Sequence, residues 1–253
     1  MKLLKMKTEK NKTKIRFLDN SLLIDDRILV LSDFHTGYEE YLFGKYVPIR
    51  AQYDETIKNL DEIFDLLSKE GVKIKEIVIL GDLKHEFGEI SDSEWRESLE
   101  LLDYLLEKSE KIVLIRGNHD NILGAIAKKR EIEVVNYYKY KEICFLHGDK
   151  MHDECKDSKI LVIGHLHPAV TLYDSYKKEK FKCFLYGKWS LNEVIIVPSF
   201  VPMVFGYDLK DLNNLEEGFS FIKNKELKNF EVIIYNKKED KEYNFGKLGK
   251  LLR

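Results

Sequence analysis

The chain has 253 residues, of which 44% are hydrophobic, and its formal net charge is -2 at pH 7. This hydrophobic content is enough for one large core, and the near-neutral charge excludes a general attraction to nucleic acids or membranes. We expect a single domain over residues 1–253, with short basic tails at about residues 1–14 and 237–253. We expect both tails to be solvated and frayed.

Three cysteines, Cys144, Cys155 and Cys183, occur without a CxxC spacing. This pattern predicts neither a disulfide framework nor a thiolate metal site, and it favours a reduced, intracellular setting. The N-terminus has no apolar core of the kind found in signal peptides, and the longest apolar stretch, residues 194–205, is too short to span a bilayer. We therefore expect a cytoplasmic protein without a membrane partner.

The first two thirds of the chain alternate buried-type strands with amphipathic helices. Residues 15–18 and 22–24 flank a turn and predict a hairpin, and a long loop is expected over residues 36–50. Apolar runs predict strands over residues 27–31, 76–80, 112–115, 142–146 and 159–163. Helical spacing of hydrophobic residues, with a capping box at Ser91–Glu94, predicts helices over residues 53–70, 92–106 and 122–130. This alternation predicts a largely parallel sheet with helices outside.

From residue 181 onward the pattern changes. Strands are expected over residues 182–186, 193–197, 203–205 and 231–235, with little helix between them. This half is expected to add a second sheet to the same domain, since no linker or internal repeat separates the two parts. The fold class is therefore α/β.

Five of the predicted strands end in residues with metal-binding side chains. These residues are Asp33, His35, Asp82, Asn118, His119, His147, His165 and His167. Five of the seven histidines of the chain are in this set, and a separate structural role for each does not explain why all five occur at equivalent positions after predicted strands. Open α/β sheets place their sites at the carboxyl ends of strands, so we expect these residues to converge on a metal centre.

The residue types in this set indicate which metals the centre binds. Carboxylate, imidazole and amide oxygen without thiolate suit borderline or hard divalent ions rather than structural zinc. There are too many candidate ligands for one ion, and a two-metal site needs a bridging ligand. Asp82 stands alone between the other groups in the sequence and is the expected bridge. We expect two divalent ions, with Mn²⁺ preferred and Fe, Zn, Ni or Mg as alternatives.

In this order, the motifs D-x-H, G-D, G-N-H-D, a lone H and G-H-x-H resemble those of the calcineurin-like metallophosphoesterase superfamily. The resemblance implies two packed mixed β-sheets flanked by helices, in a four-layer sandwich. It also implies that one metal is held by Asp33, His35, Asp82 and His167 and the other by Asp82, Asn118, His147 and His165. His119 would be the histidine near the leaving group that binds no metal.

The expected reaction is hydrolysis of a phosphate ester by in-line attack of a metal-bridging hydroxide, with His119 assisting the leaving group. Asp120 directly follows His119, so it either orients that imidazole or is an ordinary turn acid. His85 and Arg116 are candidates for supporting the ligands or contacting substrate. The second motif, Gly81-Asp82-Leu83-Lys84-His85-Glu86, lacks the arginine found at this place in phosphoserine/phosphothreonine phosphatases.

Additional features resemble ligase-associated DNA-damage-response phosphoesterases and archaeal SbcD-related phosphoesterases. These are the segments at residues 53–56, 81–85, 164–169 and 198–200. The resemblance implies a phosphodiesterase or nuclease, with DNA-repair proteins as partners and nucleic acid or nucleotides as substrate. A phosphomonoesterase or nucleotide pyrophosphatase, and a non-catalytic scaffold of the same fold, are the alternatives. The sequence does not predict an oligomeric state.

Overall fold

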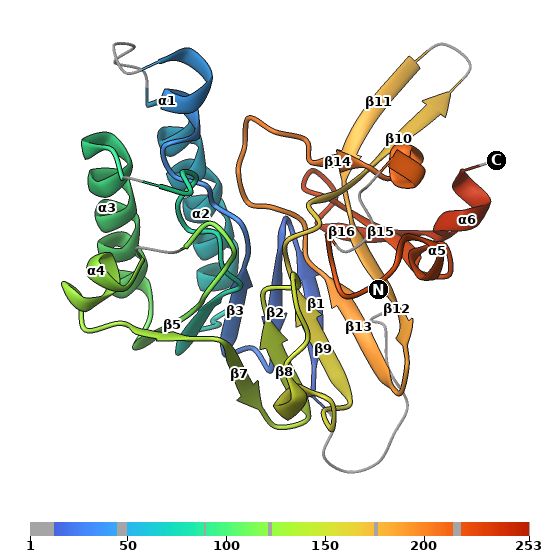
Figure 1. The fold of residues 1–253 in the computed structure, drawn as a ribbon, viewed down its shortest axis with the longest axis horizontal. Coiled ribbons are helices and arrows are strands. Elements are labelled where there is room, and N and C mark those ends of the chain that lie inside the picture. Colours follow the sequence, from blue (N-terminus) through green and yellow to red (C-terminus); the bar gives the residue numbers. More distant parts are fainter. Residues whose placement is uncertain are drawn as a thin grey trace.

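The computed structural model describes residues 13–44, 50–88, 90–120, 123–174, 177–214 and 219–252. A six-stranded sheet is built from the first half of the chain (Figure 1). Its strands are, in order, β1 (Ile15–Leu18), β2 (Ser21–Ile24), β3 (Ile28–Leu31), β4 (Glu76–Ile79), β5 (Lys111–Ile115) and β6 (Glu133–Val135). The predicted hairpin is confirmed as β1 and β2, and β3 to β6 run parallel.

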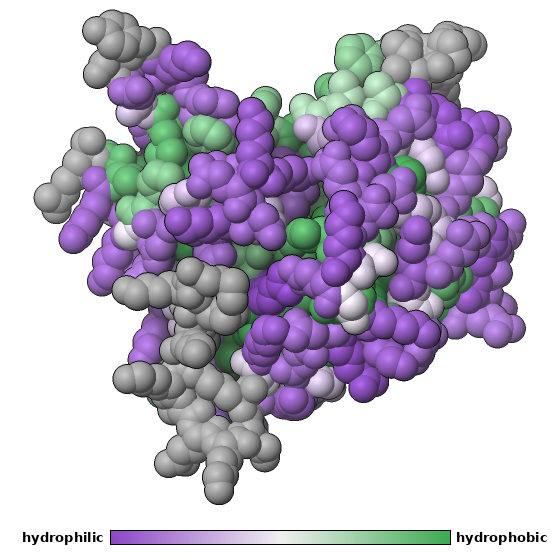
Figure 2. Space-filling view, turned by 180° about the vertical axis from the view of Figure 1, so that it is seen from behind, coloured by the Kyte–Doolittle hydropathy of each residue, from purple (hydrophilic) through white to green (hydrophobic). Residues whose placement is uncertain are grey.

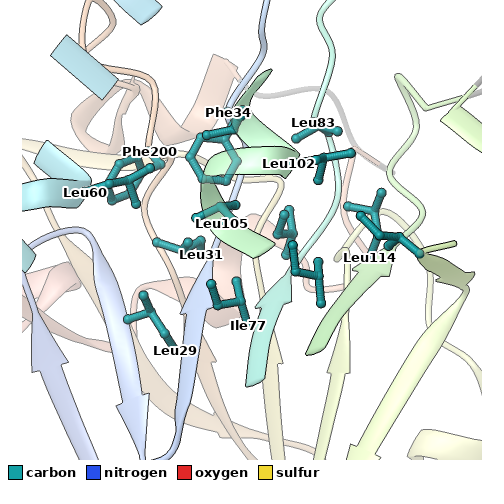
Figure 3. Close-up of a cluster of buried hydrophobic side chains, with 14 of the residues drawn as sticks. Leu29, Leu31, Phe34, Leu60, Ile77, Leu83, Leu102, Leu105, Leu114 and Phe200 are labelled. Carbon is teal, nitrogen blue, oxygen red and sulfur yellow. The ribbon is translucent and has the colours of Figure 1, made fainter. Parts of the chain in front are cut away.

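Three helices cover the outer face of this sheet: α2 (Ala51–Lys69), α3 (Asp92–Lys108) and α4 (Leu123–Lys128). Their apolar faces pack on the sheet, where Leu31 and Ile77 face Leu60 and Leu105 (Figure 3). The three predicted helices are thus confirmed. A fourth helix, α1 (Tyr38–Phe43), occupies part of the segment expected to be a loop, and residues 45–49 of that segment lie outside the described residues.

A seven-stranded sheet packs against the inner face of the first. Its strands are, in order, β16 (Lys241–Lys247), β15 (Glu231–Asn236), β12 (Phe184–Trp189), β13 (Asn192–Ile196), β9 (Ile160–Ile163), β8 (Ile143–Leu146) and β7 (Tyr137–Tyr140). Between the sheets, Val30 and Val78 of the first lie in one buried cluster with Phe145 and Val162 of the second. The expected architecture of two packed mixed sheets flanked by helices is therefore confirmed.

The boundary between the sheets differs from the prediction. The second sheet begins at Tyr137, not near residue 181, and it includes the strands expected at residues 142–146 and 159–163. A buried parallel strand reads as the same apolar run in either sheet, so the local pattern could not assign these two. The strand expected over residues 203–205 is wrong, because that segment is irregular.

A small third sheet, which the sequence did not predict, joins β11 (Lys177–Lys182), β10 (Pro168–Asp174) and β14 (Tyr207–Asp208). Short helices α5 (Asn224–Leu227) and α6 (Leu248–Leu251) cover the outer face of the second sheet with Leu227 and Leu248. The surface seen from behind is mainly hydrophilic, with hydrophobic atoms in separate patches (Figure 2).

Two expectations about the termini and cysteines are corrected. Residues 241–251 form β16 and α6 rather than a frayed basic tail, because Leu248 anchors them in the core; residues 1–12 lie outside the described residues.

Cys144 and Cys155 are paired in a disulfide, with Cα atoms 5.6 Å apart, and Cys183 is free and buried. The fold brings the two cysteines together although their spacing gave no signal. Within the described residues, no helix is both long and apolar enough to cross a bilayer.

Candidate metal centre

The loops that follow β3, β4, β5, β8 and β9 meet at one end of the two-sheet sandwich, so both sheets contribute to the site. Six predicted ligands fall into two groups, and within each group the ligand atoms lie within 4.8 Å of one another. These groups are Asp33, His35 and His167, and Asp82, His147 and His165. A further group contains His35, His85 and His119. The predicted convergence of the strand ends is present in the structure.

In the first group, His167 reaches the other two residues with one ring nitrogen. Its Nε2 lies 3.3 Å from Asp33 Oδ1 and 3.3 Å from His35 Nε2. Asp33 is fully buried, and its Oδ1 accepts no hydrogen bond from the described residues. A buried carboxylate oxygen without a donor is costly unless a cation occupies the space beside it.

In the second group, His147 has a fixed tautomer. Its Nδ1–H donates to the Leu80 carbonyl at 2.7 Å, so in the neutral ring Nε2 presents a lone pair. This Nε2 lies 2.9 Å from Asn118 Oδ1 and 3.4 Å from Asp82 Oδ2, which are also acceptors. Three acceptors around one point, with a backbone carbonyl holding the imidazole, are the arrangement expected around a divalent ion.

Asp82 lies at the junction of the two groups. Its Oδ2 is 3.8 Å from His35 Nε2 in the first group and 3.4 Å from His147 Nε2 in the second. The same oxygen is 3.9 Å from His119 Nε2, while Oδ1 accepts the His119 backbone N–H at 3.0 Å. The carboxylate is therefore placed where one oxygen faces both groups.

The electrostatics of the centre favour positive charge. Burial raises the pKa of Asp33, but the neighbouring charges of His167 and His147 and the hydrogen bond from the Ser32 hydroxyl outweigh burial and bring it to about 2. Burial lowers the pKa of His147, but the hydrogen bond and charge of Asp82 outweigh it and raise the value to about 10. Two ionised carboxylates inside the protein thus attract a proton or a metal cation to the same place. The donor set fits divalent metals.

The backbone at the site is strained. Asp33, His35, Asp82, His165 and His167 all have positive φ, between 42° and 68°. Such left-handed conformations cost non-glycine residues about 1 kcal/mol or more, and they persist where the surrounding structure fixes them. Five predicted ligands in this state indicate that the loops are shaped for the site rather than for local stability.

Two glycines permit the close approach of these loops. A Cβ on Gly117 would clash with the backbone N and carboxylate of Asp82. A Cβ on Gly164 would clash with the Ser32 hydroxyl and lie 2.7 Å from Asp33 Oδ2. The glycines of the G-N-H and G-H-x-H motifs are thus required by packing around the two carboxylates.

His119 lies beside the two groups with one free ring nitrogen. Its Nδ1–H donates to the His85 carbonyl, which leaves Nε2 on the side of Asp82. The His85 ring stacks over it, with centroids 5.5 Å apart. The residue that orients His119 is therefore the His85 backbone and not Asp120.

Asp120 has a structural role instead. Its Oδ2 accepts the backbone N–H groups of Asp82 and Gly117 at 2.8 and 2.9 Å, so it ties the β4 and β5 loops together. Burial, with a smaller contribution from the Asp82 charge, raises the pKa of Asp120 to about 7. Among the described residues, the partner of the His119 ring is the His85 carbonyl, while the Asp120 carboxylate bonds to two backbone N–H groups, which agrees with the alternative of a turn acid; a part for Asp120 in catalysis stays a prediction.

The two remaining candidates differ. His85 lies in the site, with Nδ1 3.4 Å from His35 Nδ1, and burial followed by the charge of His119 lowers its pKa to about 4. Arg116 has an exposed side chain and does not line the cavity at the site; its backbone N–H bonds to Val135. The structure therefore does not bring Arg116 to the centre.

An open cavity of about 620 Å³ lies over the centre, a size typical of ligand sites. It is lined by His35, Asp82, Asn118, His119, His165 and His167, with Phe87, Leu166, Val204, Gly206, Tyr207 and Phe219. Sequence reasoning missed the rim residues Phe87 and Phe219. Phe87 directly follows the motif at residues 81–86, so its place near the site could have been predicted from the sequence. Nothing in the local sequence indicates that Phe219 lies at the site.

A family model of calcineurin-like phosphoesterases matches residues 26–228, which include every predicted metal ligand. The chain belongs to the calcineurin-like phosphoesterase family. Membership supports a metal-dependent phosphoesterase, in agreement with the clustered carboxylates and imidazoles. The comparison with curated proteins gave no match.

A solved structure agrees with this calcineurin-like phosphoesterase fold. The chain is similar to the Pseudomonas putida nuclease MPE, with 20% identity and a TM-score of 0.59 over 88% of this chain and 92% of that chain. It is also similar to YfcE, a phosphoesterase from E. coli, with 14% identity and a TM-score of 0.39 over 87% of this chain and 98% of that chain. At this identity, the match to MPE supports the fold alone.

Proposed function

We propose that this calcineurin-like phosphoesterase is a two-metal phosphodiesterase acting on nucleic acid or nucleotides. The observation that carries the proposal is the position of Asp82 Oδ2, 3.8 Å from His35 Nε2 and 3.4 Å from His147 Nε2. One ion would be held by Asp33, His35, Asp82 and His167, and the other by Asp82, Asn118, His147 and His165. A shared carboxylate between two sets of ligands is the arrangement that two-metal hydrolysis requires.

When bound, a pair of divalent ions lowers the pKa of a water molecule, neutralises phosphate charge and holds phosphoryl oxygens for in-line attack. The protein supplies the geometry. Leu80 fixes the His147 ring through its carbonyl, and Phe219 holds His165 in the same way, with its carbonyl 2.7 Å from His165 Nε2. These contacts orient the imidazoles before any ligand arrives.

His119 is the proposed proton donor to the leaving group. Its Nδ1–H is held by the His85 carbonyl, and its Nε2 faces the cavity beside Asp82. A leaving alkoxide needs a proton as the P–O bond breaks, and the doubly protonated imidazole can provide it from Nε2 while its Nδ1–H stays bonded to the His85 carbonyl.

Metal replacement tests the two-metal part of the proposal. Protein stripped with a chelator is titrated with Mn²⁺ in a calorimeter, and then with Fe²⁺, Zn²⁺, Ni²⁺ and Mg²⁺. We expect two Mn²⁺ per chain and the highest turnover with Mn²⁺. Binding of a single ion at full activity would contradict the two-metal mechanism.

A comparison of two substrates tests the reaction type. We expect higher kcat/KM for bis(p-nitrophenyl) phosphate than for p-nitrophenyl phosphate. A strong preference for the monoester would favour a phosphomonoesterase or nucleotide pyrophosphatase, and no metal-dependent turnover of either would favour a scaffold. Single-stranded, duplex and cyclic-nucleotide substrates then test the nucleic-acid part. DNA-repair proteins as partners remain a prediction from the sequence resemblance.

A further inference from the structure

Glu94, in the first turn of α3, is connected to the candidate centre by a short chain of hydrogen bonds. The sequence assigned it to a capping box with Ser91, and Ser91 Oγ does accept the Glu94 backbone N–H at 3.1 Å. The Glu94 side chain, however, turns away from the helix end. Its Oε1 accepts the backbone N–H groups of His85 and Glu86, at 2.7 and 2.9 Å.

These two N–H groups belong to the loop that orients His119. The His85 carbonyl accepts the Nδ1–H of His119, and the His85 ring stacks on the His119 ring. The His85 N–H is also within 3.1 Å of the Thr36 carbonyl, so Glu94 and the loop after β3 hold the same point. Movement of the loop at residues 85–86 would move the acceptor that sets the tautomer of His119.

The position of Glu94 is itself fixed by packing. The side chain is fully buried, and a Cβ on Gly37 would lie 2.8 Å from Glu94 Cβ. A buried carboxylate that accepts two backbone N–H groups is a strong, rigid anchor. Residue 37 therefore has no room for a side chain if Glu94 is to reach the loop.

We propose that Glu94 is a positioning residue for His119: it holds the loop at residues 85–86 so that the His85 carbonyl binds His119 Nδ1–H and directs Nε2, which carries the donated proton, toward the leaving group. This inference rests on the proposed role of His119 as a proton donor. It assigns no contact between Glu94 and substrate or metal. A hydrogen-bonded support of this kind typically changes activity by about 10–100-fold.

The dependence of rate on the leaving group tests the proposal. Methyl p-nitrophenyl phosphate releases a good leaving group that needs little protonation, whereas methyl phenyl phosphate releases a poor one. We expect Glu94→Ala to lower kcat about tenfold more on the phenyl ester than on the p-nitrophenyl ester, with two Mn²⁺ still bound. Glu94→Gln keeps an oxygen that accepts both N–H groups, and we expect it to restore the wild-type ratio of the two rates.

Glu97 provides a matched control on the same helix. It is buried, and its Oε2 accepts the Gly37 N–H at 3.2 Å, whereas none of its hydrogen bonds with the described residues involves the loop at residues 85–86. We expect Glu97→Ala to lower stability without changing the ratio of the two rates. If Glu94→Ala does not fold, Glu94→Asp, with a shorter side chain, should show the same change in ratio at smaller size.

The outcomes distinguish the role of Glu94 from the role of His119. An equal loss of rate on both esters in Glu94→Ala or Glu94→Asp, together with a leaving-group effect in His119→Ala, overturns the role of Glu94 and leaves His119 in place. No leaving-group effect in His119→Ala overturns the role of His119 and, with it, that of Glu94. NMR of the histidine side chains gives an independent readout: the Nδ1–H of His119 should be hydrogen-bonded in the wild type and lose this hydrogen bond in Glu94→Ala.

Discussion

The two ligand groups of the candidate centre differ in how the protein holds them. In the second group, His147 and His165 each bond to a backbone carbonyl, of Leu80 and Phe219. In the first group, His35 and His167 lie next to each other, with their Nε2 atoms 3.3 Å apart. The His167 side chain is also 23% exposed. The second group is therefore oriented by the fold, and the first depends more on what it binds.

This difference follows from which strands carry the ligands. His147 and His165 come from neighbouring strands β8 and β9, and the ring of His147 reaches across to the end of β4. His35 and His167 follow strands of opposite sheets and meet where both line the cavity. Ligands whose orientation is fixed in advance lose less entropy on binding, so we expect the second group to bind its metal more tightly.

The largest effect is expected from Asp82→Ala, which removes the carboxylate shared by the two groups. We expect loss of at least one bound ion and a fall in turnover of more than about 100-fold, beyond what a change outside the ligand set costs. Calorimetric titration with Mn²⁺ and diester hydrolysis measure both. Two ions bound with unchanged affinity would show that Asp82 does not bridge the two ions.

A nearly comparable loss of rate is expected from His119→Ala, but with the metal content intact. General acid catalysis contributes about 10²–10⁴-fold, so kcat should fall within that range. Metal analysis by mass spectrometry provides the control, because both groups keep all their ligands. Unchanged turnover would remove His119 from the mechanism.

A paired substitution tests the comparison directly. We expect two Mn²⁺ binding steps of unequal affinity in the wild type. His167→Ala should abolish the weaker step and leave the tighter one, while His147→Ala should weaken the tighter step by about 10–100-fold or more. The opposite assignment would mean that the backbone carbonyls do not determine metal affinity.

The smallest effect is expected from Asp120→Asn, which keeps an acceptor for the N–H groups of Asp82 and Gly117. The pKa of Asp120 is raised from 3.8 to about 7 in the folded protein, so the folded state binds more protons between these values. The contribution of the protonated Asp120 carboxyl to the free energy of unfolding is fully present below about pH 4. It is lost as the pH rises to 7, by a total on the order of a few kcal/mol. Urea unfolding of metal-free protein at pH 4 to 7 should show a weaker pH dependence in the variant. Identical slopes would contradict the buried, neutral carboxyl.

The sequence alone determined the strands that carry the site and the residue types at their ends. A buried strand followed by a glycine or serine and then a polar side chain is a local signal, so Asp33, Asp82 and His165 could be placed at strand ends without knowing the fold. Family membership then followed from the order of the motifs, and the family model confirms it.

Only the tertiary structure decided which sheet each strand joins and what holds each functional side chain. Strands β8 and β9 have the same apolar pattern in either sheet, and the Cys144–Cys155 disulfide has no sequence signature. The support of His119 by the His85 carbonyl, and of that loop by Glu94, depends on backbone atoms that are the same in every residue. The sequence states the chemical type of each side chain directly, whereas contacts to backbone groups form only once the chain has folded.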